Sequence, residues 1–300
     1  MSQRPFVGGY VCFLFLGLVG GAVLAGSAWA VKGAAGDRIP ERFERYSLIQ
    51  VTEVSGDRGK GVPAGGRLNR AVESARQRAL ERAERYLDRK LRDAGLDYEI
   101  RRAKPDGAVR ILDRRALGTD DQGRSRWRID TEVEFSVHPV TEAGKKAPQA
   151  AIDQAELLTV RLWTDKKQYR PGEPVTVFFE GNRDFYAKVV RITAGGAIEQ
   201  ILPNNYRQLS FFRKGVRYRT PGEGDRFTLN APPGSRERLL IFACPYAMSH
   251  INMKTTAGGV YQYRGRRSSF ERAVRSGLAL REDDVAEFFT AAWDFEWSGP

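Results

Sequence analysis

The chain has 300 residues, of which 41% are hydrophobic and 29% charged, a composition that excludes disorder along the whole length. It is long enough for two ordinary domains that each bury their own core. The formal net charge of +12 and the pI of about 9.8 mark a basic protein that attracts anionic partners, without choosing among phosphate backbones, acidic lipids, lipopolysaccharide and acidic proteins.

Residues 1–30 have the pattern of a secretory signal peptide. Arg4 supplies a positive charge, an uncharged apolar run follows at residues 11–25, and Ala28 and Ala30 form the small-x-small pattern of a cleavage site. We expect cleavage after Ala30 and export to the periplasm or the cell envelope. An uncleaved anchor is the alternative, because the apolar stretch that ends at Ala30 is just long enough to cross a bilayer.

Residues 31–139 predict a small α+β domain with one helix on an antiparallel sheet. A weakly alternating strand at 46–54 and a glycine-rich loop at 55–67 come first, and a helix is expected from its N-cap Asn69 to Ala94. The apolar residues of this helix recur at three- and four-residue steps and are mostly alanine, which suits close packing on a sheet. The arginines between them form either a solvated face or an anion-binding surface.

Three strands are expected after the helix, and the last of them, at 125–139, alternates most clearly. One of its faces carries the apolar residues and the other carries Arg128, Asp130, Glu132 and Glu134. The turn before it, at 118–123, is expected to close a hairpin.

A second domain is expected after a linker at 140–156. Residues 157–297 contain short β-rich runs separated by Pro and Gly, which predicts a mainly antiparallel β-sandwich. Pro171-Gly172 suits the centre of a type II turn. The alternating runs that follow it, at 175–179 and 185–192, predict the first hairpin of the sandwich.

The end of the chain predicts mixed structure. We expect short C-terminal helices at 268–277 and 282–289, followed by a last strand at 290–297. The fold class is therefore α+β, with the helix-on-sheet domain followed by the β-sandwich domain and its short C-terminal helices.

Residues that carry chemistry in enzymes are sparse. The two histidines, His138 and His250, lie in different segments, and there is no Gly-x-Ser-x-Gly pattern, so the sequence offers no triad. Loss of the signal peptide leaves Cys244 as the single cysteine, which excludes an intramolecular disulfide and predicts a small buried side chain. Such a scattered set does not form a zinc pattern. The sequence therefore nominates no catalytic, cofactor-binding or metal-binding residue.

Two stretches interleave basic and aromatic residues, at 206–219 and at 260–275. Single-strand binders use this combination, but an exported protein seldom meets nucleic acid, so we expect no nucleic acid and predict an envelope protein or an anionic envelope surface as the partner. We hypothesise that both stretches lie on one face. The residues predicted to bind the partner or an anion are Tyr206, Arg207, Arg213, Lys214, Arg217, Arg219, Arg264, Arg266 and Arg267.

Five short motifs follow one another in order between Leu158 and about Pro245: "YRPGEPVTV", "RDFYAKVVRI", "GAIEQILPN", "FRKGVRYRTP" and "FTLNAPPGSRERLLIFAC". Together they resemble the bacterial domain of unknown function 4384 family. The resemblance implies an all-β accessory module, envelope-associated or part of a multi-domain protein, with no assigned catalysis and no binding residues to transfer. The extension that begins at Cys244 departs from the family and is expected to be a working surface of this chain. The helix "AVESARQRALERAERYL" gives the N-terminal unit a weak resemblance to domains of exported lipoproteins and flagellar outer-ring accessory proteins.

These observations predict a non-enzymatic, exported envelope protein that acts as a binding or scaffolding module in a larger assembly. Two alternatives remain open. An envelope hydrolase acting on glycan or peptide would need two converging carboxylates in a cleft. A secretion or flagellar accessory factor would differ from the main interpretation only in its partner.

Overall fold

A computed structural model describes residues 43–56, 64–93, 98–102, 109–139 and 156–299. The N-terminal region comprises β1 (Phe43–Ser55), α1 (Ala64–Asp93), β2 (Tyr98–Arg102), β3 (Val109–Thr119) and β4 (Ser125–Pro139). The C-terminal region comprises β5 (Val160–Thr164), β6 (Gln168–Tyr169), β7 (Val177–Gly181), β8 (Phe185–Ile192), β9 (Ile198–Leu202), β10 (Phe211–Phe212), β11 (Tyr218–Thr220), β12 (Arg236–Cys244), β13 (Lys254–Thr255), β14 (Tyr261–Tyr263), α3 (Arg267–Ser276) and β15 (Val285–Trp297).

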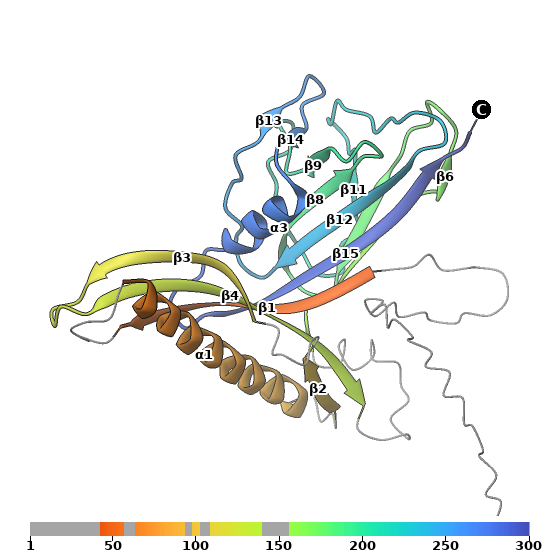
Figure 1. Cartoon of the computed structure of the whole chain (residues 1–300). Coiled ribbons are helices and arrows are strands. Elements are labelled where there is room, and N and C mark those ends of the chain that lie inside the picture. Colours follow the sequence, from red (N-terminus) through yellow and green to blue (C-terminus); the bar gives the residue numbers. More distant parts are fainter. Residues whose placement is uncertain (1–42, 57–63, 94–97, 103–108, 140–155, 300) are drawn as a thin grey trace, which may run out of the picture.

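One large sheet runs through both regions (Figure 1). Its order is β13-β14-β9-β8-β12-β15-β1-β4-β2, with β10 on β8, β3 on β4 and β6 on β15. The two regions meet where β1 pairs antiparallel with β15, from Phe43 opposite Ala292 to Gln50 opposite Val285. The second sheet has three strands in the order β11-β7-β5.

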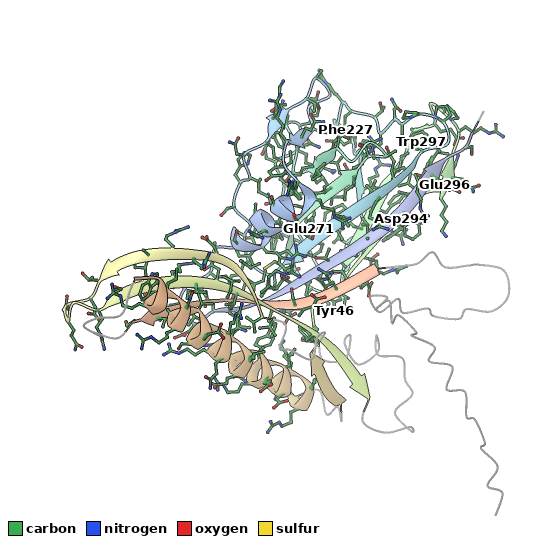
Figure 2. The ribbon with its side chains drawn as sticks, in the orientation of Figure 1. Tyr46, Phe227, Glu271, Asp294, Glu296 and Trp297 are labelled. Atoms are coloured by element: carbon green, nitrogen blue, oxygen red, sulfur yellow. The ribbon has the colours of Figure 1, made fainter. Side chains whose placement is uncertain are left out.

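The large sheet is covered on both faces, which we call face A and face B. On face A, the three-stranded sheet packs over β8, β12 and β15 around buried side chains such as Phe179 and Val189, while α1 packs over β1 and β4. Tyr46 of β1 lies where these two cores meet, with its ring 5.0 Å from Phe289 and 6.3 Å from Phe135 (Figure 2). On face B, α3 buries Phe270 against β8, β12 and β15.

The long helix α1 forms for the reason that its sequence indicates. Its small apolar residues at three- and four-residue steps, including Ala75, Ala79 and Ala83, are all buried against the sheet. Such short side chains allow so close an approach that Gln50 of β1 donates a hydrogen bond of 2.9 Å to the backbone carbonyl of Ala79. The prediction of Asn69 as the N-cap is wrong, because the helix begins at Ala64 and Asn69 lies within it.

The prediction of a mixed α+β chain with mostly antiparallel strands is confirmed, and the predicted strands at 46–54 and 125–139 are present as β1 and β4. The division into a helix-on-sheet domain and a separate sandwich is not seen in this form, because β1 continues the sheet of the C-terminal region. The linker predicted at 140–156 lies almost wholly outside the described residues, as does the signal peptide at 1–30.

Two predictions in the C-terminal region are wrong. The runs 175–179 and 185–192 do not form a hairpin, because β7 belongs to the three-stranded sheet and β8 to the large one. The chain crosses between the sheets directly after Gly181, where an added Cβ would lie 2.4 Å from the Phe185 ring. The helix predicted at 282–289 is also wrong: β15 begins at Val285, so α3 is the one helix among residues 156–299.

The turn at Pro171-Gly172 is confirmed. Gly172 has a φ of 82°, and the backbone N–H of Glu173 donates to the carbonyl of Arg170 at 3.0 Å. A positive φ at the third position is what a type II turn requires and what glycine permits without strain.

Candidate functional site

The outer face of the three-stranded sheet presents aromatic rings and arginines. Strand alternation turns Leu162 of β5 and Phe179 of β7 into the core, so their neighbours point outward. Trp163 and Phe178, which are paired across the strands, stack with their ring centroids 5.7 Å apart and their planes at 17°. Arg219 of β11 is paired with Phe178 on the other side.

Two guanidinium groups lie over the Trp163 ring. That of Arg161 is 5.3 Å from the ring centroid and that of Arg217 is 5.7 Å away. Cation–π contact holds a guanidinium by its flat face, and the N–H groups around its edge remain able to donate to an anion. Glu180 places a negative charge on this face; it is paired in register with Arg161 and lies 3.9 Å from Arg217. The surface therefore combines aromatic area with an excess of positive charge.

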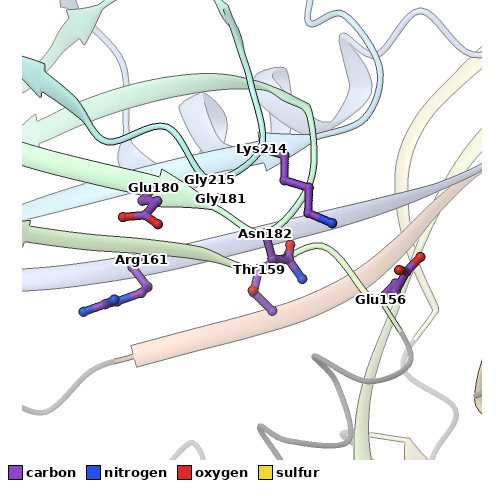
Figure 3. A pocket seen from close by; sticks show the side chains of 8 residues that line it. All are labelled: Glu156, Thr159, Arg161, Glu180, Gly181, Asn182, Lys214 and Gly215. Carbon is purple, nitrogen blue, oxygen red and sulfur yellow. The ribbon is translucent and has the colours of Figure 1, made fainter.

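A surface hollow of about 360 Å³ adjoins this face where β5 begins and β7 ends (Figure 3). Asn182 shapes it by accepting a hydrogen bond from the Thr159 backbone N–H at 2.8 Å and donating one to the Leu157 carbonyl at 2.8 Å. The backbone N–H of Lys214 donates to Asp184 at 2.7 Å, which fixes the turn from which the Lys214 amine extends. The hollow is lined by Glu156, Thr159, Arg161, Glu180, Gly181, Asn182, Lys214 and Gly215.

A second hollow, of about 330 Å³, lies between α1 and the start of β15. Three arginines of α1 line it together with Asp283 and Asp284. Arg82 forms an ion pair with Asp283. The two aspartates offset most of the positive charge of the three arginines, so the charge excess is smaller here than on the outer face.

The sequence-predicted residues of the stretch 206–219 divide into two kinds. Arg207 is half-buried: it lies 3.3 Å from Asp225 and donates to the Arg219 carbonyl at 3.0 Å, so its role is structural. Burial lowers the pKa of its guanidinium, and the negative charge of Asp225 opposes this shift. The exposed members are Tyr206, Arg213, Lys214, Arg217 and Arg219.

The predicted residues of the stretch 260–275 are exposed: Arg264 and Arg266 lie in the connection from β14 to α3, and Arg267 is the first residue of α3. Arg267 forms an ion pair with Glu271 one turn later, at 2.7 Å. The two stretches touch where Gln208 donates to the Tyr261 hydroxyl at 2.9 Å. Beyond that contact they diverge, because α3 covers face B whereas the three-stranded sheet covers face A.

Three residues of the outer face, Arg161, Trp163 and Phe178, were not predicted from the sequence. Their signal was the alternation of "TVRLWT" and "VTVFFEG", in which every second residue is buried. An aromatic residue in such a run is ordinarily assigned to the core, so the sequence alone gave no reason to turn Trp163 outward.

The deeply buried carboxylates of the structure are engaged by arginines. Glu132 lies 2.8 Å from Arg275 and also accepts a hydrogen bond from the Ser47 hydroxyl at 2.8 Å. Glu237 lies 2.7 Å from Arg191. These groups hold strands and helix together rather than facing a hollow.

Glu287 has the same character on face A. It accepts hydrogen bonds from the Tyr86 hydroxyl at 2.5 Å, the Leu158 backbone N–H at 2.6 Å and Arg183 at 2.9 Å. Burial, reinforced by the charge of Glu287 and this hydrogen bond, raises the pKa of Tyr86. The contact joins α1, β15 and the turn between β7 and β8.

Comparison with known proteins gives one match. The chain contains, at residues 168–245, a domain that matches the family described as "Domain of unknown function (DUF4384)", as the five motifs indicated. No curated protein and no solved structure matches the chain. Within the described ranges, no cluster of three or more His, Cys, Asp or Glu side chains is placed to hold a metal ion. Likewise, none of the described helices is both long and apolar enough to cross a membrane.

Proposed function

We propose that the chain is a non-enzymatic, exported protein of the bacterial cell envelope that serves as a binding or scaffolding module in a larger assembly. Its contact surface is the outer face of the three-stranded sheet together with the exposed cations of the adjoining turn, Arg213 and Lys214. The signal-like sequence at 1–30 supports export, and the DUF4384 domain supports an accessory role.

One observation carries the proposal: two guanidinium groups lie over an outward-facing tryptophan. The Trp163 ring is partly exposed, and aromatic residues and arginine are the types enriched at the centres of protein interfaces. The arginines would attract an acidic partner from a distance and then fix its orientation by hydrogen bonds.

The arrangement of acids supports binding over hydrolysis. A glycosidase or peptidase needs carboxylates that face a substrate. Here Glu132, Glu237 and Glu287 are each engaged by an arginine inside the fold. The acids that line the hollow beside the outer face, Glu156 and Glu180, are at least partly exposed to solvent.

Charge reversal tests the proposal. Cross-linking in intact cells followed by pull-down would identify the partner of the unaltered chain. Replacing Arg213, Lys214, Arg217 and Arg219 by glutamate should abolish this capture, because the cations that attract the partner become repulsive. The melting temperature should change little, since all four side chains are exposed.

The matched control reverses four exposed arginines of α1: Arg76, Arg85, Arg89 and Arg92. It alters the net charge by the same amount on a different surface and should leave capture intact. Capture that survives the first set of substitutions, or that is lost equally with both sets, would refute the proposed surface.

A further inference from the structure

The hollow between α1 and the start of β15, which we call the α1 hollow, contains arginines that the fold does not use. Three arginines line it, and Arg82 among them is held by its ion pair with Asp283. Among the described residues, the side chains of Arg85 and Arg89 form neither an ion pair nor a hydrogen bond. Two guanidinium groups at this hollow of about 330 Å³ are therefore available to a ligand.

Helix geometry brings these two groups together. Arg85 and Arg89 are four residues apart in α1, so their side chains lie one turn apart on the same face. Like charges at this spacing repel each other and slightly destabilise a helix. The row continues at three- and four-residue steps with Arg78, Arg82 and Arg92. An anion between Arg85 and Arg89 would replace their repulsion by two attractive contacts.

The wall opposite α1 is a tight turn whose acids are already engaged. Asp283 has a φ of 69°, a left-handed conformation that few residues other than glycine adopt, and its carboxylate pairs with Arg82. The Asp284 carboxylate accepts a hydrogen bond of 2.7 Å from the backbone N–H of Arg281. Both acids of the α1 hollow thus have a partner in the fold, whereas two of its three arginines do not.

We propose that the α1 hollow binds a phosphate group, as the free ion or as a monoester, between Arg85 and Arg89. A phosphate monoester carries about two negative charges at pH 7 and three acceptor oxygens, and guanidinium forks match its geometry. A carboxylate, with one charge, is satisfied by one arginine: Arg191 alone holds both oxygens of Glu237, each at 2.7 Å. Two free arginines at one hollow therefore suit a dianion better.

This site is separate from the contact surface proposed above, because it lies on α1 and β15 and shares no lining residue with the three-stranded sheet. It adds a ligand to the protein and does not name the partner of the assembly.

A titration at constant ionic strength tests the site. Sodium phosphate or glucose 6-phosphate replaces sodium chloride in a solution of the purified protein, so that general screening does not change. The NMR signals of the Arg85 and Arg89 Nε–H groups should shift and reach saturation, and sodium acetate should shift them less. Saturation by inorganic phosphate shows that the free ion is sufficient, whereas saturation by glucose 6-phosphate alone assigns a monoester.

Substitutions that leave the fold intact by circular dichroism locate the site. Arg85→Gln and Arg89→Gln should each weaken phosphate binding about tenfold, because each removes charge-assisted hydrogen bonds. The backbone amide of Asp284 reports binding in these variants. The control combines Arg76→Gln with Arg272→Gln, two exposed arginines that do not line the α1 hollow, and should leave the affinity unchanged.

Asp283→Asn should act in the opposite direction. It removes a negative charge from the α1 hollow and releases Arg82, and asparagine tolerates the positive φ at this position. We expect phosphate to bind about fivefold more tightly, the effect of one charge interaction at a partly exposed site.

The outcomes distinguish this proposal from the proposed function. The phosphate site is refuted if neither phosphate compound saturates the signals, if the control weakens binding as much as the α1 substitutions, or if Asp283→Asn weakens it. None of these results affects the capture of an assembly partner. The charge-reversal control described above replaces Arg85 and Arg89 as well, so it should abolish phosphate binding while sparing capture. Loss of both would show that the two surfaces are not independent.

Discussion

The N-terminal and C-terminal regions share one sheet, but the hydrophobic cores that cover this sheet differ in kind between them. The N-terminal region packs an alanine-rich helix on β1 and β4, so its core is thin and formed by close backbone approach. The C-terminal region packs two sheets around large aromatic side chains, with Phe179, Phe212 and Tyr218 in mutual contact. Aromatic side chains bury far more area per residue than alanine. We infer that the C-terminal region provides most of the stability.

The junction between the two regions combines backbone pairing with buried polar contacts. At the junction the two regions share backbone hydrogen bonds between β1 and β15, and each face adds a buried carboxylate: Glu132 meets Arg275 on face B, and Glu287 meets Tyr86 on face A. A buried ion pair contributes little net stability but is costly to break, so it favours one arrangement over others. The matched family segment, 168–245, contains neither β1 nor β15.

The largest effect is expected in the aromatic core. Phe179→Ala should lower the free energy of unfolding by about 4 kcal/mol, because it removes a fully buried ring that contacts two others. Urea denaturation measures this change, and hydrogen exchange shows where it acts. If the shared sheet makes the regions cooperative, amides of β1 should lose protection together with those of β15. Leu87→Ala in α1 is the matched substitution in the N-terminal region. Two separate unfolding transitions in urea would contradict cooperative unfolding of the two regions.

Breaking the junction should have the next largest effect. Arg275→Ala leaves Glu132, which is 1% exposed, without its buried partner. We expect a loss of about 3 kcal/mol, at the low end for a broken buried pair, because Arg110 remains 3.0 Å from Glu132. Arg267→Ala, which removes an exposed pair on the same helix, should cost less than about 1 kcal/mol. Similar losses in both variants, measured by urea denaturation, would contradict the role assigned to Glu132.

The sequence predicted the elements of this fold better than their assembly. The spacing of alanines placed α1, and the alternation at 125–139 placed β4, because these signals depend on neighbours along the chain. Glu132 was correctly assigned to the face of β4 opposite its apolar residues. Its burial could not be foreseen, since it depends on Arg275, which is 143 residues away.

Other predictions from the sequence were wrong for related physical reasons. Val285–Phe289 contains helix formers and is buried on both faces of the sheet, so it shows no period-two pattern and its strand was not recognised. The crossing after Gly181 resembles a hairpin in sequence, because turn residues connect strands in either arrangement. Of the candidate site, the exposed cations of 206–219 were predicted, but the outward position of Trp163 depends on which of two sheets its strand joins.

The smallest effect has the opposite sign and concerns Lys188 of β8, a buried charge within the C-terminal region. Its side chain is 4% exposed, and no ion pair or hydrogen bond to it is found among the described residues. Burial lowers its pKa from 10.5 to about 8. The unfolded chain therefore binds this proton more tightly, so stability should rise with pH between about 8 and 10.5 and carry the full penalty below about 8.

Lys188→Met should stabilise the protein at pH 7 by about 2 kcal/mol and flatten this rise. Urea denaturation across that pH range measures both effects. A variant that is less stable at pH 7, or that keeps the same rise, would show that the amine has a partner in the folded protein. In that case Lys188 would resemble the buried carboxylates of the junction, Glu132 and Glu287. Removing the arginine partner of such a carboxylate is expected to destabilise the protein, whereas removing an unpartnered buried charge is expected to stabilise it.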